Sequence, residues 1–198
     1  MGIEDKRKAR KGRYLAEYLV FRLLVCLIDA LPTRTAVRLA ESLAFVMHRV
    51  LPKKLSRYHV ARENLKLAFG SERSDAELEE LIRKMWVHLF RLIVEIVQLP
   101  RKLRLYNCAD VIAFRNRDET VKAMCCGRPV IVLSGHFGNW EMAVSTFGVF
   151  GFPMGVVARD LDNPYLHQWF QNFRQSTRHR LLSKKGAGNE IVKYLNRR

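Results

Sequence analysis

The fold is predicted first from residues 129–141, which read Pro-Val-Ile-Val-Leu-Ser-Gly-His-Phe-Gly-Asn-Trp-Glu. Residues 129–133 form a short, continuous apolar run rich in β-branched side chains, which is typical of a buried strand in a parallel sheet. Residues 134–138 contain two glycines and are predicted to be a loop. Asn139 is a good N-cap for a helix over residues 139–150. The stretch therefore predicts a strand, a loop and a helix in succession.

The rest of the C-terminal half continues this alternation. We expect a helix over residues 118–126, strands at residues 154–158 and 181–182, and helices over residues 163–178 and 188–196. Strand–helix–strand order implies right-handed βαβ units and a mainly parallel sheet. The predicted fold class is therefore α/β, with a helical N-terminal region.

That N-terminal region has apolar residues at helical spacing. The breaks predict helices that end at Pro32, Pro52 and Gly70, and a long helix from the capping box at residues 74–77 to Pro100. We accordingly divide the chain into three segments. They are a basic leader with a membrane-anchoring or interfacial helix at residues 1–31, a helical region at 32–104, and an α/β catalytic region at 105–198.

The first segment has the composition of a membrane-binding element. Residues 1–13 hold six basic and two acidic residues, and residues 14–31 are largely apolar. Glu17, Arg22 and Asp29 interrupt the apolar run, and each charge costs about 2.5–3.5 kcal/mol near the centre of a bilayer. We therefore interpret the helix as interfacial, or as a tilted anchor, behind a basic patch for anionic headgroups. An ordinary amphipathic core helix is the alternative.

Composition restricts the function further. The chain has 198 residues, of which 48% are hydrophobic, so it can bury a core. Lys and Arg total 35 against 19 acidic residues, a net charge of +16, which favours an anionic partner: membrane lipid, nucleic acid or an acidic protein. The four cysteines form no CxxC pair and no zinc spacing, and we expect neither a metal nor a cofactor. Buried free thiols favour a cytoplasmic location.

His136 and Glu141 form the candidate catalytic pair. Residues five apart would not share a face of one helix, so the spacing suits a histidine in the loop and a glutamate in the first helical turn, where the helix dipole favours a carboxylate. The carboxylate can orient the imidazole, which can then take a proton from a substrate hydroxyl. The alternative is a locally hydrogen-bonded histidine and a solvent-facing glutamate. No GxSxG motif, which would carry a nucleophilic serine, is present. We therefore expect the substrate hydroxyl to attack an acyl donor directly, without a covalent enzyme intermediate.

The same stretch resembles a known family. Residues 134–141 resemble the HxxxxE/D block of the bacterial lipid A biosynthesis (lauroyl/myristoyl) acyltransferases, in the lysophospholipid acyltransferase-like superfamily. Residues 63–69, Glu-Asn-Leu-Lys-Leu-Ala-Phe, resemble a segment after the helical N-terminus of that family, and residues 158–164, Ala-Arg-Asp-Leu-Asp-Asn-Pro, resemble its "R…NP" segment. The similarity continues through residues 173–186, although Arg178 stands near a position where the family usually has glycine.

The resemblance implies a function and a location. It implies transfer of a fatty acyl chain from acyl carrier protein, or from acyl-CoA, to a glycolipid hydroxyl. The enzyme would lie on the cytoplasmic face of the bacterial inner membrane, single-anchored or monotopic. His136 would be the general base and Glu141 its orienting partner. Substrate-binding roles are expected for five residues: Gly138, Asn139, Arg159, Asn163 and Arg174. Family members continue beyond this point with further strands, so we expect the acyltransferase-like fold to be incomplete here.

Two other functions remain open from the sequence. One keeps the chemistry but uses another acceptor, either a different glycolipid, such as a phosphatidylinositol mannoside, or a glycerolipid. The other is a non-enzymatic basic protein that binds membrane or nucleic acid, since aromatic and basic residues interleave over residues 165–180. The apolar N-terminal helix and the lack of a recognisable binding module argue against nucleic acid, and we expect none as a partner.

Overall fold

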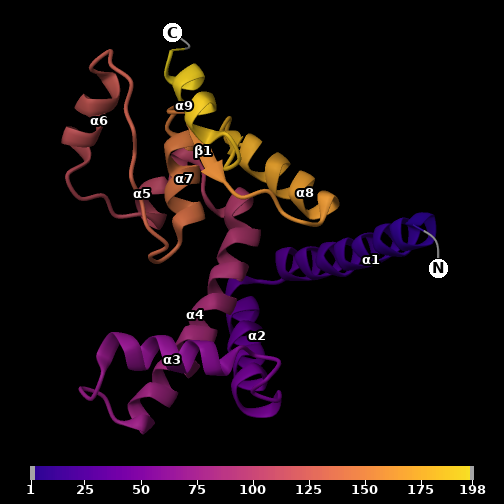
Figure 1. Cartoon of the computed structure of the whole chain (residues 1–198). Helices are drawn as coiled ribbons and strands as arrows, with labels where there is room; N and C mark the ends of the chain where they lie inside the picture. The colour runs from indigo at the N-terminus through magenta and orange to yellow at the C-terminus, as the bar shows by residue number, and fades with distance from the viewer. Residues whose placement is uncertain (1–2, 197–198) are drawn as a thin grey trace. The chain divides into compact units, whose positions relative to one another are not determined.

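The computed structural model describes residues 3–196, with side chains from residue 10 onward, and Figure 1 shows the order of the elements. Lys6, Arg7 and Lys8 of the basic leader lie outside the described side chains. Contacts divide the chain into two compact units, which we describe separately: unit 1 comprises Met1–Leu24 and Leu99–Arg198, and unit 2 comprises Val25–Gln98. The three segments expected from the sequence were drawn by composition and function, whereas these units are defined by contact.

Unit 2 is helical, as predicted. Its elements are the end of α1 (Ile3–Ala30), α2 (Thr33–Phe45), a π-helical turn η1 (Val46–Val50), α3 (Tyr58–Phe69) and most of α4 (Asp75–Lys102). The predicted capping box is confirmed, because the backbone N–H of Ser74 donates to Glu77 and that of Glu77 donates to the Ser74 hydroxyl. Helix α4 continues two residues beyond Pro100, so the prediction that Pro100 ends it was wrong. Proline removes its own N–H donor, but the last turn still forms, because Leu103 N–H donates to Leu99 O at 2.9 Å.

One buried amide fastens three helices of unit 2 together. The Gln98 amide nitrogen donates to the carbonyls of Ile28 and Leu31, at 2.9 and 3.1 Å. Its oxygen accepts from the Thr33 hydroxyl at 2.9 Å. These bonds satisfy carbonyls that the end of α1 leaves without an intrahelical partner. Beside them lies a small core formed by α2 alanines, α4 side chains and residues at or just after the end of α1: Ala36, Ala40, Val94, Phe90, Ile28 and Leu31.

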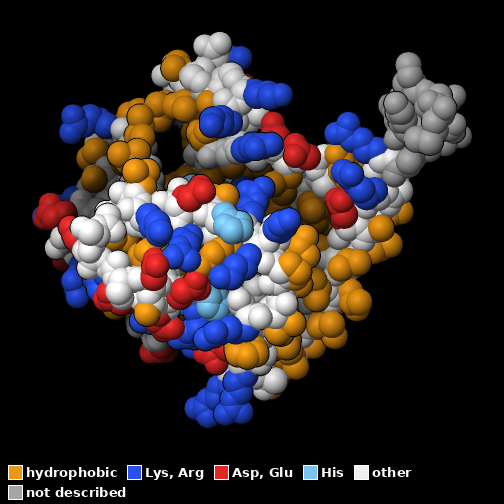
Figure 2. Space-filling view, turned by 60° about the horizontal axis from the view of Figure 1, so that its bottom comes forward, with side chains coloured by type: hydrophobic (Ala, Val, Ile, Leu, Met, Phe, Trp, Pro, Cys, Tyr) orange, Lys and Arg blue, Asp and Glu red, His pale blue; other side chains and the backbone are white. Residues whose placement is uncertain are grey.

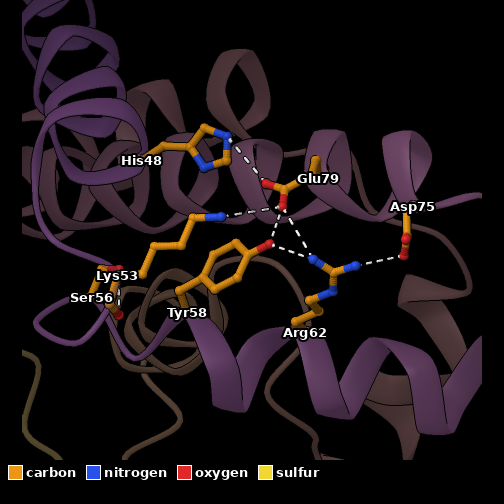
Figure 3. A network of polar contacts seen from close by, with 7 residues as sticks. All are labelled: His48, Lys53, Ser56, Tyr58, Arg62, Asp75 and Glu79. Atoms are coloured by element: carbon orange, nitrogen blue, oxygen red, sulfur yellow. Dashed lines mark hydrogen bonds and ion pairs between the residues drawn. The ribbon is translucent and has the colours of Figure 1, made fainter.

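A polar network around Glu79 of α4 holds the opposite end of unit 2 (Figure 3). Four side chains surround its carboxylate: His48, Lys53, Tyr58 and Arg62. The Tyr58 hydroxyl donates to Glu79 and accepts from Arg62, whose guanidinium also pairs with Asp75 at 2.6 Å. Because these groups come from η1, the following turn, α3 and α4, the network ties those elements together.

Unit 1 contains the parallel sheet that the sequence predicted. Strand β1 (Gly155–Ala158) pairs in parallel with β2 (Arg180–Ser183), with Gly155 opposite Arg180 and Ala158 opposite Ser183. Helix α8 (Pro164–Gln175) connects the two strands, and α9 (Ala187–Leu195) follows β2. The α/β fold class is thus confirmed, as one βαβ unit beside the short elements η2 (Leu105–Asn107), α5 (Cys108–Val111), α6 (Arg117–Cys125) and α7 (Trp140–Val149).

The predicted strand at residues 129–133 was wrong. The segment has no regular secondary structure, and the side chains of Ile131 and Leu133 are 73% and 95% exposed. In residues 3–196 no strand pairs with this segment, so its backbone forms no interstrand hydrogen bonds and its apolar side chains are not buried against a sheet. An apolar β-branched run indicates a buried strand only where a neighbouring strand is present to receive it.

Helix α1 packs on α8 through its aromatic side chains. Tyr18 stacks on Tyr165 with ring centroids 5.7 Å apart, and Phe21 meets Trp169 edge to face at 4.9 Å. Elsewhere on α1 a set of large apolar side chains stays exposed: Leu15, Leu19, Val20, Leu23, Leu24 and Leu27. Among the described residues, no helix has both the length and the hydropathy needed to cross a membrane.

Arg178 gives a first prediction. It lies in the left-handed region, with φ of 64°, just before β2, and a Cβ is costly there, whereas glycine adopts that conformation freely. We expect Arg178→Gly to raise the free energy of unfolding by up to about 1 kcal/mol, measured by urea denaturation. Arg178→Ala, which removes the side chain but keeps the Cβ, is the matched control. Equal stability of the two variants would contradict this explanation.

Candidate active site

The motif loop leads into α7 as the sequence predicts. Gly138 has a φ of 59°, a conformation that favours glycine. The Asn139 side chain then caps the helix by accepting from the Met142 N–H at 3.0 Å. Glu141 lies in the first turn, near the positive end of the helix dipole. The local sequence thus places a carboxylate at the start of α7, and the structure buries it to 4% exposure.

The partner of that carboxylate is an arginine. Arg174, in the last turn of α8, donates from Nη2 to Glu141 Oε1 at 2.5 Å and from Nε to Oε2 at 3.2 Å. Both side chains are largely buried, and the two-pronged geometry is the strongest form of this contact. Sequence reasoning placed Arg174 among the substrate-binding residues; the structure places its guanidinium on Glu141.

His136 stands apart from this pair. Its side chain is exposed, and its ring lies 4.8 Å from the ring of Trp140, centroid to centroid. Among the described residues, no hydrogen bond joins His136 to Glu141, whose two oxygens face Arg174. The expected hydrogen bond is therefore not formed in this structure, and the catalytic roles of both residues stay predictions.

The other predicted site residues have structural contacts of their own. Asn163 is buried; its amide nitrogen donates to Tyr14 O at 2.9 Å and to Glu17 Oε2 at 3.0 Å, and its oxygen caps α8 by accepting from Tyr165 N–H at 3.0 Å. That side chain holds α1 to the start of α8 and has little capacity left for a ligand. Arg159 is exposed and pairs with Asp162 at 3.5 Å. Neither residue contacts His136 or Glu141 in the described part of the chain.

An apolar pocket of about 520 Å³ opens beside the motif. One wall comes from α6 and the segment before it, and the other from α7 and residues 150–152. Asn139 and Met142 of the motif region reach its lining, and Arg115 and Arg117 also line it. Most of the remaining lining is hydrophobic: Ile112, Phe114, Val121, Met124, Ala143, Phe147, Phe150 and Phe152. A pocket of this kind suits an alkyl chain.

The sequence did not indicate this pocket, because each of the segments that form its walls, taken alone, has the apolar pattern of ordinary core packing. The nearest sequence signal was the three phenylalanines at positions 147, 150 and 152.

A buried histidine that sequence reasoning also missed fixes α7 against the sheet region. His179 Nδ1 accepts from the Met154 N–H at 3.0 Å, so its proton lies on Nε2, which donates to Val144 O at 2.8 Å. The chain passes close to α7 here, since a Cβ on Gly148 would lie 2.3 Å from the Thr177 carbonyl oxygen. Nothing in the sequence around His179 indicated this role.

His179 predicts a pH dependence of stability. Burial lowers the pKa of His179 from the ordinary value of 6.5, so the folded protein keeps the ring neutral. Its contribution to stability is present above pH 6.5 and is lost as pH falls towards the lowered value, because the unfolded chain then binds more protons. We expect the free energy of unfolding, from urea titrations, to fall between pH 7.5 and 5.5, and to fall less in His179→Gln.

His48 is the necessary comparison. Burial also lowers the pKa of His48, so His48→Gln should reduce the pH slope independently, and the double variant should reduce it further. A pH slope in His179→Gln equal to that of the wild type would contradict the assignment.

The α/β fold, the histidine loop bounded by glycines, the buried glutamate in the next helix and the adjoining apolar pocket are consistent with a protein of the acyltransferase-like class. The comparison with protein families agrees: the family model described as bacterial lipid A biosynthesis acyltransferase matches residues 3–198. The chain belongs to this family, whose reaction is O-acyl transfer from an acyl donor to a glycolipid acceptor. Neither the curated proteins nor the solved structures gave a match.

Proposed function

We propose that this chain transfers a fatty acyl group from an acyl carrier protein thioester, or from acyl-CoA, to a hydroxyl of a lipid A-type glycolipid. The observation that carries the proposal is the apolar pocket whose lining includes Asn139 and Met142, because it gives an acyl chain a place next to the motif loop. The strongly basic composition suits both an acidic carrier protein and an anionic lipid.

In the proposed reaction His136 is the general base. One imidazole nitrogen takes the proton of the acceptor hydroxyl while the hydroxyl oxygen attacks the thioester carbonyl. The resulting tetrahedral intermediate then expels the thiolate, which takes up the proton, so that an ester forms as the thioester breaks. The loop at residues 134–138 has no regular structure, and catalytic hydrogen bonds are often long before substrate binds. We therefore infer that bound substrate draws His136 towards Glu141, which Arg174 holds in position.

We also propose that the enzyme works on the cytoplasmic face of the bacterial inner membrane, as a monotopic protein. The support is the exposed leucine face of α1 and the described basic residues Arg10, Lys11 and Arg13 at its start. Fractionation tests this location. Recovery in the soluble fraction at low salt, with tight binding to nucleic acid, would contradict both the location and the acyltransferase proposal.

The direct test of the function identifies the product. Membranes or detergent-dispersed lipids are incubated with the purified chain and labelled acyl carrier protein, and the labelled lipid is identified by mass spectrometry. A labelled lipid A-type product supports the proposal. A labelled glycerolipid or other glycolipid would show that the acceptor is that lipid instead. If no labelled lipid forms under any condition, the proposal fails.

The pocket gives a sharper prediction about the donor. Ala143 is an exposed lining residue on α7, so Ala143→Phe should narrow the pocket without disturbing the core. We expect KM to rise about tenfold or more for long acyl donors and less for short ones, because only a long chain loses methylene contacts in the narrowed pocket. Each lost methylene contact weakens discrimination by roughly 10–200-fold at most. Val157→Phe, an exposed substitution outside the pocket, is the control. Equal KM changes for both chain lengths would contradict the acyl-chain assignment.

A further inference from the structure

The apolar pocket between α6 and α7 also carries polar side chains. Its polar lining residues are Arg115, Arg117, Thr120, Asn139 and Thr146, and the rest of its lining is hydrophobic. A pocket of this kind binds a largely apolar ligand, and its few polar groups fix the orientation of that ligand. The polar side chains that have no partner in the protein therefore indicate which chemical group the ligand carries.

Most of the polar lining residues already have a partner. The hydroxyls of Thr120 and Thr146 each donate to the backbone carbonyl four residues earlier, at 3.3 and 2.7 Å. The Asn139 side chain caps α7, and Arg117 Nε pairs with Asp118 at 3.2 Å. These groups satisfy one another within the protein, so they do not by themselves call for a charged ligand.

Arg115 differs from them. It is exposed, and among the described side chains no hydrogen bond or ion pair engages its guanidinium. On the face that Figure 2 presents, by contrast, many Lys and Arg side chains lie among Asp and Glu side chains. Arg115 follows Phe114, whose ring meets that of Phe150 at 5.5 Å and so brings two walls of the pocket into contact. An unpaired cation thus belongs to an otherwise apolar lining.

We propose that this pocket binds an unesterified long-chain fatty acid, with its alkyl chain against the apolar lining and its carboxylate on the Arg115 guanidinium. The planar guanidinium can donate two parallel hydrogen bonds to a carboxylate. One unpaired cation balances the single charge of a carboxylate, whereas a phosphate monoester carries a charge of about −1.5 to −2. The other arginine of the lining, Arg117, is already paired. A single-chain carboxylate therefore matches both the lining and its charge.

The fatty acid has a regulatory consequence for acyl transfer. This consequence rests on the proposed function, whereas the binding itself does not. A fatty acid in the pocket excludes the acyl chain of the donor, because both chains use the same apolar lining. Free fatty acid is therefore a competitive inhibitor with respect to the acyl donor, and it slows transfer when unesterified chains accumulate.

Isothermal titration calorimetry of the full chain, at neutral pH and without any acyl donor, tests the binding. The ligands are decanoate, decanol and decyl phosphate, which share one alkyl chain and differ in the head group. We expect decanoate to bind at least tenfold more tightly than decanol, because only the carboxylate forms charge-assisted hydrogen bonds with Arg115.

Three variants assign the two ends of the ligand. Arg115→Gln should weaken decanoate binding about tenfold or more and decanol binding less than twofold. Arg180→Gln removes an equal charge from an exposed residue of β2 outside the lining and should change neither affinity more than twofold. Ala143→Phe narrows the pocket and should weaken both ligands. Circular dichroism of each variant shows that it is folded.

Four results would overturn the proposal. They are equal affinity for decanoate and decanol, an equal loss in Arg115→Gln and Arg180→Gln, decanoate binding that Ala143→Phe leaves unchanged, and decyl phosphate binding more than tenfold tighter than decanoate. The last result would identify a phosphate ester as the ligand in place of a fatty acid.

Enzyme kinetics separate this proposal from the proposed function. Decanoate binding that needs Arg115 would stand even if the wild type transferred no acyl group. Where transfer does occur, inhibition by decanoate should be competitive with the acyl donor and about tenfold weaker in Arg115→Gln. Inhibition that is not competitive, or that is equal in wild type and variant, would contradict the shared pocket while leaving acyl transfer itself established.

Discussion

Arg174→Met is expected to destabilise the protein by about 3–5 kcal/mol, the range for removing one partner of a buried ion pair. The variant would leave the Glu141 carboxylate at 4% exposure without the guanidinium that contacts both of its oxygens. The helix dipole of α7 offsets only about 0.3–1 kcal/mol of this cost. Urea denaturation of the wild type and the variant measures the difference.

The double variant Glu141→Gln with Arg174→Met is the control for this prediction. Without the buried carboxylate, the loss of arginine should cost much less, so the double variant should recover most of the lost stability. If Arg174→Met instead left stability unchanged and only raised KM for a substrate, Arg174 would be a binding residue, as the sequence suggested, and not the partner of Glu141.

His136→Ala is expected to lower kcat for acyl transfer by about 10²–10⁴-fold, the usual contribution of a general base. Because the His136 side chain is exposed and has no hydrogen bond to Glu141, we expect the thermal midpoint to stay the same. Initial rates and melting curves of the same preparation measure both effects.

His59→Ala is the matched control, since it removes another exposed histidine, on α3. Full acyl transfer by His136→Ala would refute the proposed mechanism. A fall in activity that tracked a fall in thermal stability would equally refute it, because His136 would then be a structural residue.

The sequence predicted most of the local structure correctly, because the signals there were local. The Asn139 cap, the capping box at residues 74–77, and the strand at residues 154–158 each depend on residues close in sequence. The strand at residues 129–133 failed because a strand also needs a neighbour, which no local pattern contains. The Arg174–Glu141 pair joins residues 33 apart in the sequence, so no local pattern indicated it.

The candidate site was predictable only in part. The pattern of His136 and Glu141 and the glycines marked the loop, and the family resemblance named the chemistry. The apolar pocket and the Asn163 contacts with Tyr14 and Glu17 depend on how distant segments pack, and a periodic pattern cannot specify that. Arg178 is an exception, because here the sequence did indicate a structural feature. Arg178 stands near a position where the family usually has glycine, and its backbone is in the left-handed region that favours glycine.

The most direct test of the account is the stoichiometry of one turnover. Purified chain is mixed with acyl carrier protein thioester, with and without a lipid A-type acceptor, and free thiol, acylated lipid and acylated protein are followed together. We predict one thiol released for each acyl group on the lipid, no release without acceptor, and no acyl group on the protein. Thiol release without acceptor, or an acylated protein that forms before the lipid product, would contradict direct attack by a hydroxyl that His136 activates.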